Sequence, residues 1–210
     1  ELKSGDEVQV VSTDGSTVTG WDDQSGLGND LTASGDPAYV TDLLNGEPVV
    51  RFDGNGDLLE RTGLNGVSTG SADRTLLYVV RYDSPGFGGL AYGSPDCNEA
   101  FGAIVNGDGA LTAQGWCPAN DYPAGVQGTG TGWMTQSVVL NDSSFTHYRN
   151  GTAIDSGTHT YETTSDRLVL GSEMTPPPHL DMDVAAVYAY DRALSDTERQ
   201  KLRAYLRERY

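Results

Sequence analysis

Short apolar runs, separated by Gly, Asn and Asp, fill this chain as far as Ser195 and predict strands joined by turns. Residues 74–82 are the strongest candidate for a central strand. In residues 184–190 both alternating sets of positions are apolar, which is typical of a strand in the middle of a sheet covered on both sides. Many short strands bury their apolar sides most simply as two antiparallel sheets stacked in a jelly roll.

The pattern changes at Ser195, where a helix is expected to begin. Ser195 and Glu198 have the spacing of a capping box, in which each side chain bonds the backbone N–H of the other residue. Acids in the first turn and arginines in the last match the helix dipole. The apolar stripe is narrow and consists of Leu194, Leu202, Tyr205 and Leu206. The chain is therefore predicted to be an all-β sandwich with a short C-terminal α-helix that packs by one edge.

Turn residues between apolar runs predict the hairpins. Residues 100–105 and 110–116 flank an Asn-Gly-Asp-Gly turn, and residues 136–140 and 146–154 form a second pair. A first strand and hairpin are expected between Val8 and Trp21, with a turn at residues 13–16.

The length of 210 residues suits one large β-sandwich, so we expect a single domain over residues 1–210. The net charge of −17 repels phosphate backbones and anionic lipid, which makes nucleic acid and membrane surfaces poor partners. Acidic polysaccharides are also disfavoured unless a cation intervenes. No apolar run approaches the 18 residues of a membrane-spanning helix.

The two cysteines, Cys97 and Cys117, are predicted to form a disulfide. Closing a loop of this length contributes about 3 kcal/mol in polymer estimates. A metal pair is less favoured, because no His lies at ligand spacing. The sequence starts at Glu1 without a signal peptide, so we expect a mature or excised domain of a larger protein, located outside the cell or on its surface.

Four segments, at residues 21–31, 44–54, 168–173 and 187–199, resemble in order the motifs of the laminin-G-like, concanavalin A-like lectin/glucanase domains. The similarity is greatest to the type found in large secreted proteins of bacteria and archaea. It implies the jelly-roll fold from Trp21 to the end. It leaves function open, since members include binding modules, adhesins, glycosidases and lyases. Where relatives often have an acid in the closing strand, this chain has Ala185 and Ala186.

Catalytic patterns are scarce. The E-x-D-x-E spacing of jelly-roll glycosidases is absent. His147 and Tyr148 are adjacent, so a strand would point them to opposite faces, and they cannot form one lyase site. An exposed strand face is the favoured interpretation of His147 and Arg149.

Binding chemistry is better represented. An aromatic platform with polar groups suits a sugar, and the candidates beside the cysteines are Trp116, Asn120, Asp121, Tyr122 and Tyr92. The alternative is a disulfide-braced loop with Trp116 in the core. Trp21 is expected in the core, and Trp133 is undecided.

Calcium as a structural ion is an expectation for Asp181 and Asp183, the one i,i+2 acid pair at the start of the last strand. The alternative is a solvated strand end. A second candidate loop contains Asp22, Asp23, Asn29 and Asp30, whose oxygens could equally satisfy a turn.

Three hypotheses follow from the sequence. The first is a secreted, non-catalytic carbohydrate-binding or adhesion module whose partner is an extracellular poly- or oligosaccharide. The second is a glycoside hydrolase or polysaccharide lyase on the same fold. The third is a protein-binding domain of a surface layer.

Overall fold

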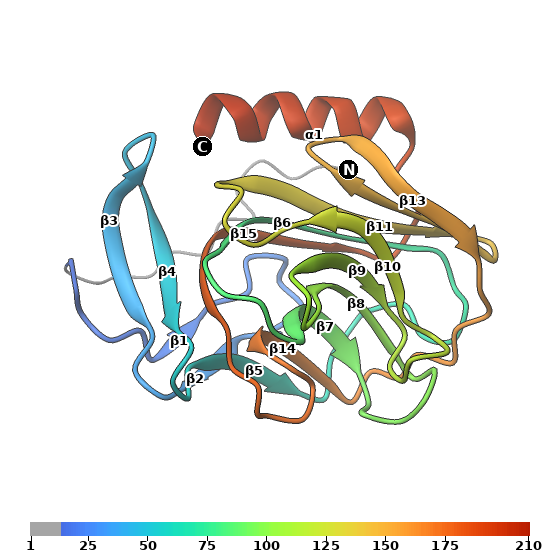
Figure 1. The fold of residues 1–210 in the computed structure, drawn as a ribbon, viewed down its shortest axis with the longest axis horizontal. Coiled ribbons are helices and arrows are strands. Elements are labelled where there is room, and N and C mark those ends of the chain that lie inside the picture. Colours follow the sequence, from blue (N-terminus) through green and yellow to red (C-terminus); the bar gives the residue numbers. More distant parts are fainter. Residues whose placement is uncertain (1–13) are drawn as a thin grey trace.

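The computed structural model describes residues 14–210, in which two antiparallel sheets stack face to face and one helix lies on the outside (Figure 1). The eight-stranded sheet consists, in spatial order, of β1 (Gly20–Trp21), β2 (Leu31–Ser34), β5 (Leu58–Thr62), β14 (Arg167–Ser172), β7 (Gly88–Gly93), β8 (Ala100–Val105), β9 (Ala110–Gln114) and β10 (Tyr122–Gln127). The seven-stranded sheet consists of β13 (Thr152–Thr158), β12 (Ser144–Arg149), β11 (Met134–Asn141), β6 (Arg74–Tyr82), β15 (Asp181–Tyr190), β4 (Glu47–Asp53) and β3 (Ala38–Leu44). The helix is α1 (Asp196–Arg209).

The predicted all-β sandwich with a C-terminal helix is confirmed. The two predicted hairpin regions are present as β8–β9 and as β11–β12–β13. The strand expected at residues 8–11 lies outside the described residues.

Strands β6 and β15 form the centre of the seven-stranded sheet, as their apolar patterns predict. β6 lies between β11 and β15, and β15 lies between β6 and β4. A β-bulge between Val184 and Ala186 interrupts the simple alternation expected for β15. As a result Val184 and Val187 both point into the core between the sheets, and Ala186 packs on the outer face.

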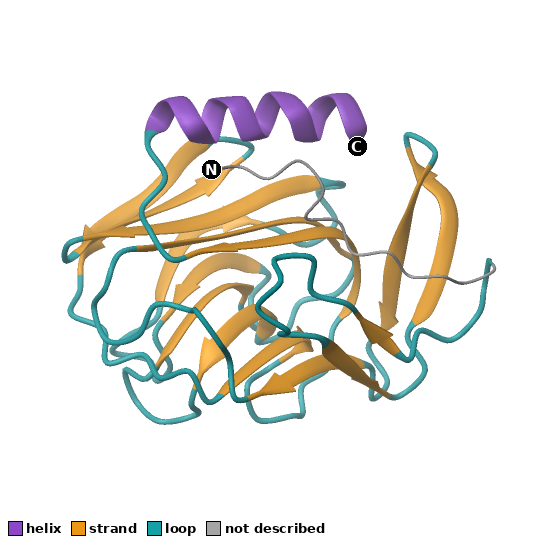
Figure 2. Cartoon of the chain, turned by 180° about the vertical axis from the view of Figure 1, so that it is seen from behind, coloured by secondary structure: helices purple, strands orange, loops and turns teal. Residues whose placement is uncertain are grey.

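The outer face of this sheet carries α1 (Figure 2). The capping box is confirmed: Ser195 Oγ accepts from the Glu198 backbone N–H at 3.4 Å, and Glu198 Oε2 accepts from the Ser195 N–H at 2.8 Å. Leu194, Leu202 and Leu206 pack against the sheet. Tyr205, expected in the same stripe, is 41% exposed, so the packed edge is narrower than predicted.

The core between the sheets is mainly apolar, and a buried polar network crosses it. Trp21 belongs to this core at 4% exposure, as predicted. Gln136 Oε1 lies 3.1 Å from the hydroxyl of Tyr78 and 2.9 Å from that of Tyr82. The Gln136 amide nitrogen donates to the Ile104 carbonyl across the core at 3.0 Å. The network therefore ties the two sheets together by satisfied polar groups.

His147 completes this network and corrects the expectation of an exposed strand face, because its side chain is fully buried. Its Nε2 lies 3.1 Å from the Gln136 amide nitrogen, and its Nδ1 has no hydrogen-bond partner within residues 14–210. Burial lowers the pKa of His147 to about 3. The ring is therefore neutral at physiological pH.

We expect His147 to make stability depend on pH. The unfolded chain binds a proton near pH 6.5 and the folded protein does so only near pH 3, so stability is complete above pH 6.5 and falls as the pH decreases through this window. Between pH 7 and 5.5 the free energy of unfolding of the wild type should fall by about 1 kcal/mol more than that of His147→Gln. Urea denaturation at both pH values measures the difference, and equal losses in the two proteins would contradict it.

Candidate functional site

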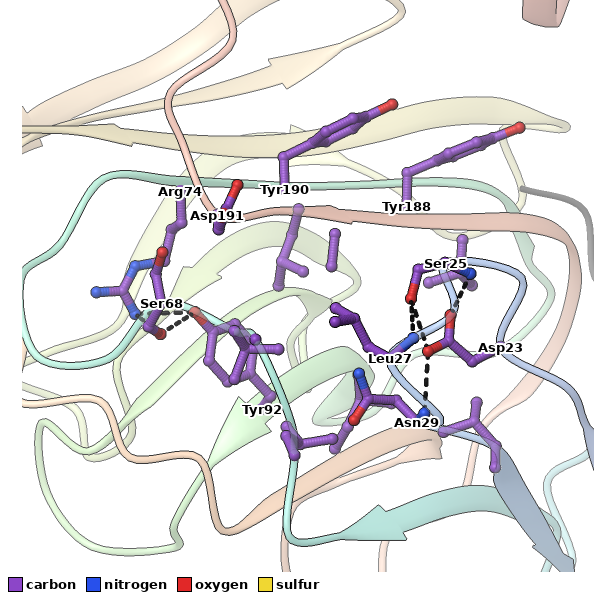
Figure 3. Close-up of a pocket in the computed structure, with 18 of the residues that line it drawn as sticks. Asp23, Ser25, Leu27, Asn29, Ser68, Arg74, Tyr92, Tyr188, Tyr190 and Asp191 are labelled. Atoms are coloured by element: carbon purple, nitrogen blue, oxygen red, sulfur yellow. Dashed lines mark hydrogen bonds between the residues drawn. The ribbon is translucent and has the colours of Figure 1, made fainter. Parts of the chain in front are cut away.

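A pocket of about 160 Å³ opens between the two sheets at one end of the sandwich (Figure 3). We call it the rim pocket. It is formed by the loop after β1, the loop before β6 and the last residues of β15. Its apolar lining includes Trp21, Leu64, Leu76, Leu168 and Val187. These side chains come from both sheets, so the pocket exists only where the two layers meet.

Side chains near the end of β15 point alternately to the two faces of the sheet. Val187 and Ala189 line the pocket, and Val187 also packs against the core. Tyr188 and Tyr190 pack with the cluster under α1, and Figure 3 shows their rings pointing away from the pocket. The tyrosines therefore contribute backbone, and not rings, to this wall.

The loop of residues 22–30 is held by its own carboxylates. Asp23 accepts hydrogen bonds from the Ser25 backbone N–H at 2.8 Å, from Ser25 Oγ at 2.8 Å and from the Asn29 N–H at 2.9 Å (Figure 3). Burial raises the pKa of Asp23, but these bonds outweigh it and the pKa is lowered. Asp30 Oδ1 accepts from the Asp23 N–H at 2.8 Å. The carboxylates of Asp23 and Asp30, two of the groups considered for calcium, thus close a turn.

A second loop is bound to the first across the mouth of the pocket. The Asn29 amide donates to the Asn65 carbonyl at 3.0 Å, and the Asn65 N–H donates back to Asn29 Oδ1 at 2.8 Å. The Asn65 amide also donates to the Leu27 carbonyl at 3.1 Å. Leu27, 47% exposed, lies against Gly66, where a Cβ would approach its methyl group to 2.7 Å. The mouth is therefore preformed.

Arg74 forms the back wall and is 1% exposed. Its guanidinium donates to the carbonyls of Ala72, Ser68 and Gly70 and, at 3.0 Å, to the hydroxyl of Tyr92. The Tyr92 hydroxyl donates in turn to the Ser68 carbonyl at 2.7 Å. Burial raises the pKa of Tyr92 to about 12, although Arg74 acts to lower it. Both side chains shape the wall, and their polar atoms already have partners.

Few polar groups of the pocket remain available to bind a ligand. Trp21 Nε1 is buried and has no hydrogen-bond partner in the described part of the chain. Asp22, Gln24 and Asp191 line the pocket from exposed positions, and the Gln24 amide donates to the Asp22 carbonyl at 3.3 Å. The pocket thus combines an apolar floor with one indole donor, two carboxylates and an amide.

The loop that carries the disulfide does not line the rim pocket. The Cys97–Cys117 disulfide is confirmed, with a Cα–Cα distance of 5.2 Å. Asp121 Oδ1 accepts from the N–H groups of Gly115 and Trp116 at 3.1 Å, and the Asn120 amide donates to the Trp116 carbonyl at 2.8 Å. The loop therefore brings Trp116, Asn120 and Asp121 together, but the two polar side chains clamp the backbone of Trp116, which has φ = 66°.

Trp116 packs on the outer face of the eight-stranded sheet, against Ala91, Ile104, Val169 and Met174. Trp116 is therefore partly buried, but outside the core between the sheets. Tyr92 belongs to that core, so the two rings do not share a site. Burial raises the pKa of the nearby Asp121 to about 6, with the charge of Glu173 adding to the effect. Burial also raises the pKa of Glu173.

Tyr122 turns away from Trp116 and toward the core. Its hydroxyl lies 2.8 Å from Nδ1 of His159, whose Nε2 is 2.6 Å from Asn98 Oδ1. No sequence pattern singles out His159. Its partners lie 37 and 61 residues away along the chain, so no local pattern announces this contact.

Asp183 is 1% exposed and lies between two arginines, which corrects the solvated strand end considered for it. Arg51 Nε donates to Asp183 Oδ1 at 2.8 Å, and Arg81 Nη2 lies 2.7 Å from Oδ2. Among residues 14–210 no group of three or more His, Cys, Asp or Glu side chains could hold a metal ion. Calcium at Asp181 and Asp183 stays a prediction.

The sequence matches no protein-family model and no curated protein. Similar folds occur among solved structures. A GH54 α-L-arabinofuranosidase aligns with a TM-score of 0.75 and 13% identity, over 90% of this chain and 50% of that one. The binding domain of Paraclostridial Mosquitocidal Protein 1 aligns at 0.71 and 15%, over 91% and 51%. Domain 4 of AbnA, a GH43 extracellular arabinanase from Geobacillus stearothermophilus, aligns at 0.67 and 16%, over 86% and 91%.

At these identities the likeness shows the fold alone, which is a β-sandwich of two antiparallel sheets. The chain spans about half the length of the first two of these proteins and most of the arabinanase domain. Within the described residues, α1 is not long and apolar enough to cross a lipid bilayer.

We expect the carboxyl group of Asp121 to titrate with a midpoint near pH 6, because burial disfavours its charged form. The folded protein then binds this proton more tightly than the unfolded chain. Asp121→Asn should therefore stabilise the domain more at pH 8 than at pH 5. Carbon-13 NMR of the side-chain carboxyl groups measures the midpoint, with Asp121→Asn assigning the signal. A midpoint near 4 would contradict the burial inferred here.

Proposed function

We propose that this domain binds a neutral carbohydrate in the rim pocket, as a non-catalytic extracellular module of a larger protein. The observation that carries the proposal is the composition of the pocket, an apolar floor with the unpaired indole N–H of Trp21 and a mouth with exposed polar groups. A sugar ring has an apolar face and hydroxyl groups at its edge, and this arrangement is complementary to it.

The charge of the pocket favours neutral sugars over anionic ones. Asp22 and Asp191 accept hydrogen bonds from hydroxyl groups, and the one cationic side chain of the lining, Arg74, has its donors occupied. A uronate or sulfate would meet carboxylates here, in a protein with a net charge of −17. Ligand pockets usually measure about 300–1,000 Å³, so this smaller one suits a single sugar residue or a chain end.

The similar structures support a carbohydrate partner. The arabinanase domain, nearly all of which aligns with this chain, is described in complex with arabinotriose. A second arabinofuranosidase is described with arabinofuranosyl-α-1,2-xylobiose. Both ligands are neutral. The four sequence motifs further support a place among the laminin-G-like, concanavalin A-like domains, and the disulfide supports an extracellular location.

One observation favours the hydrolase alternative. Asp121 and Glu173 lie near each other beside Trp116, and the pKa of each carboxyl is raised. Glycosidases need two carboxyl groups with different roles, one of them protonated. Release of reducing sugar by the wild type but not by Glu173→Gln would replace the binding-module proposal with this one.

The proposal predicts that removing the polar groups at the mouth weakens binding. Gln24→Ala combined with Asp191→Asn should raise the Kd for the bound neutral oligosaccharide about tenfold, which is about 1.4 kcal/mol. Calorimetry with a panel of neutral oligosaccharides that includes arabinotriose measures the effect. The control is Phe87→Ala, an aromatic residue that is 44% exposed on the loop between β6 and β7.

Unchanged affinity in the double variant would contradict the proposed site. If Trp116→Ala lost binding instead, the site would move to the disulfide loop. Each titration is run with calcium and with EDTA, so that a calcium requirement is seen in the same experiment.

A further inference from the structure

The outer face of the seven-stranded sheet has two parts. α1 covers one part through Leu77, Val79 and Ala186. Beside it, the strand registers align a polar row across β4, β15 and β6, and Trp133, which packs against the cluster under α1, stands at the end of this row. Arg51 on β4 pairs with Asp183 on β15, and Asp183 pairs with Arg81 on β6. Trp133 stands beside Arg81, one residue before β11, with the guanidinium carbon 5.8 Å from the ring centroid. We call this set, Trp133, Arg81, Asp183 and Arg51, the cross-strand row.

Asp183 holds the two guanidinium groups of the row in place. It accepts from Arg51 Nε at 2.8 Å and Nη2 at 3.0 Å, and from Arg81 Nη2 at 2.7 Å. The carboxylate is 1% exposed, whereas the Arg51 and Arg81 side chains are 39% and 28% exposed. Their Nη1 groups have no hydrogen-bond partner within the described residues. The row therefore presents oriented donors to solvent at little further entropic cost.

Acids border the row on one side. The register places Asp53 opposite Asp181, and the Asp83 N–H donates to the Asp181 carbonyl at 2.9 Å. Two arginines thus face four aspartates, so the local charge is negative. An anionic ligand is disfavoured at this surface. A neutral ligand that both donates and accepts hydrogen bonds, and that has an apolar face for Trp133, is complementary to it.

The shape of the row indicates a chain and not a single ring. Neighbouring strands lie about 4.8 Å apart, so Trp133 and Arg51 are separated by roughly 14 Å. The sheet continues beyond both ends of the row, to β12 on one side and to β3 on the other.

We propose that the cross-strand row is a second carbohydrate site, which binds the interior of a neutral polysaccharide chain lying across the strands. Trp133 stacks on one sugar ring, and the free donors of Arg81 and Arg51 bind hydroxyl groups further along the chain. This site is separate from the rim pocket, and its existence does not depend on the pocket.

The test uses affinity gel electrophoresis with arabinan, arabinoxylan, mixed-linkage β-glucan and galactomannan, and with polygalacturonate as the anionic comparison. The wild type should be retarded by at least one neutral polysaccharide and not by polygalacturonate. Trp133→Ala should weaken that binding about tenfold or more. Arg51→Lys is the second variant, because it keeps a cation beside Asp183 and removes the planar fork of donors. It should also weaken binding.

The rim-pocket double variant Gln24→Ala/Asp191→Asn should keep its polysaccharide affinity, and Trp133→Ala should keep its oligosaccharide affinity. The two proposals can therefore fail separately. Circular dichroism confirms that each variant is folded. Full polysaccharide affinity in both Trp133→Ala and Arg51→Lys overturns the second site, as does binding of none of the four neutral polysaccharides or a preference for polygalacturonate.

Discussion

The pairing of β15 with β6, and the bulge that interrupts it, decides which residues of β15 face the core, the rim pocket and the helix. Before the bulge, Asp183 faces outward and Val184 faces the core. After it, Ala186 faces the helix, and Val187 faces the core and the rim pocket. One inserted residue thus separates the polar end of the outer face from the end that α1 covers.

Buried polar groups in this protein mostly have internal partners, and this limits what can act on a ligand. Arg74 and Tyr92 bind the loop before β6, Asp23 binds its own loop, and Asn120 and Asp121 bind the backbone of Trp116. An unpaired buried polar group costs about 1–3 kcal/mol, so folding recruits nearby side chains first. The groups that the two proposed sites use are the indole N–H of Trp21, the exposed groups at the pocket mouth and the arginine donors of the cross-strand row.

Charge narrows the ligand class further. Both candidate surfaces carry more carboxylates than available cations, in a chain with 30 acids and 13 bases. Hydroxyl-rich neutral ligands suit such surfaces, because carboxylates accept hydrogen bonds from hydroxyl groups without charge repulsion.

The sequence by itself determined the elements and the layer architecture. Strand β6, the hairpin of β8 and β9, the capping box of α1 and the disulfide all depend on local periodicity, turn chemistry or the presence of only two cysteines. Only the tertiary structure decided which residues share a site. Tyr92 and Trp116 were predicted to form one group, but they lie on opposite sides of a sheet. His147 was predicted to be exposed and is buried. Asp183 lies between arginines from two other strands. The physical reason is that a strand shows its period but not its partners, and a single bulge exchanges the faces of all residues beyond it.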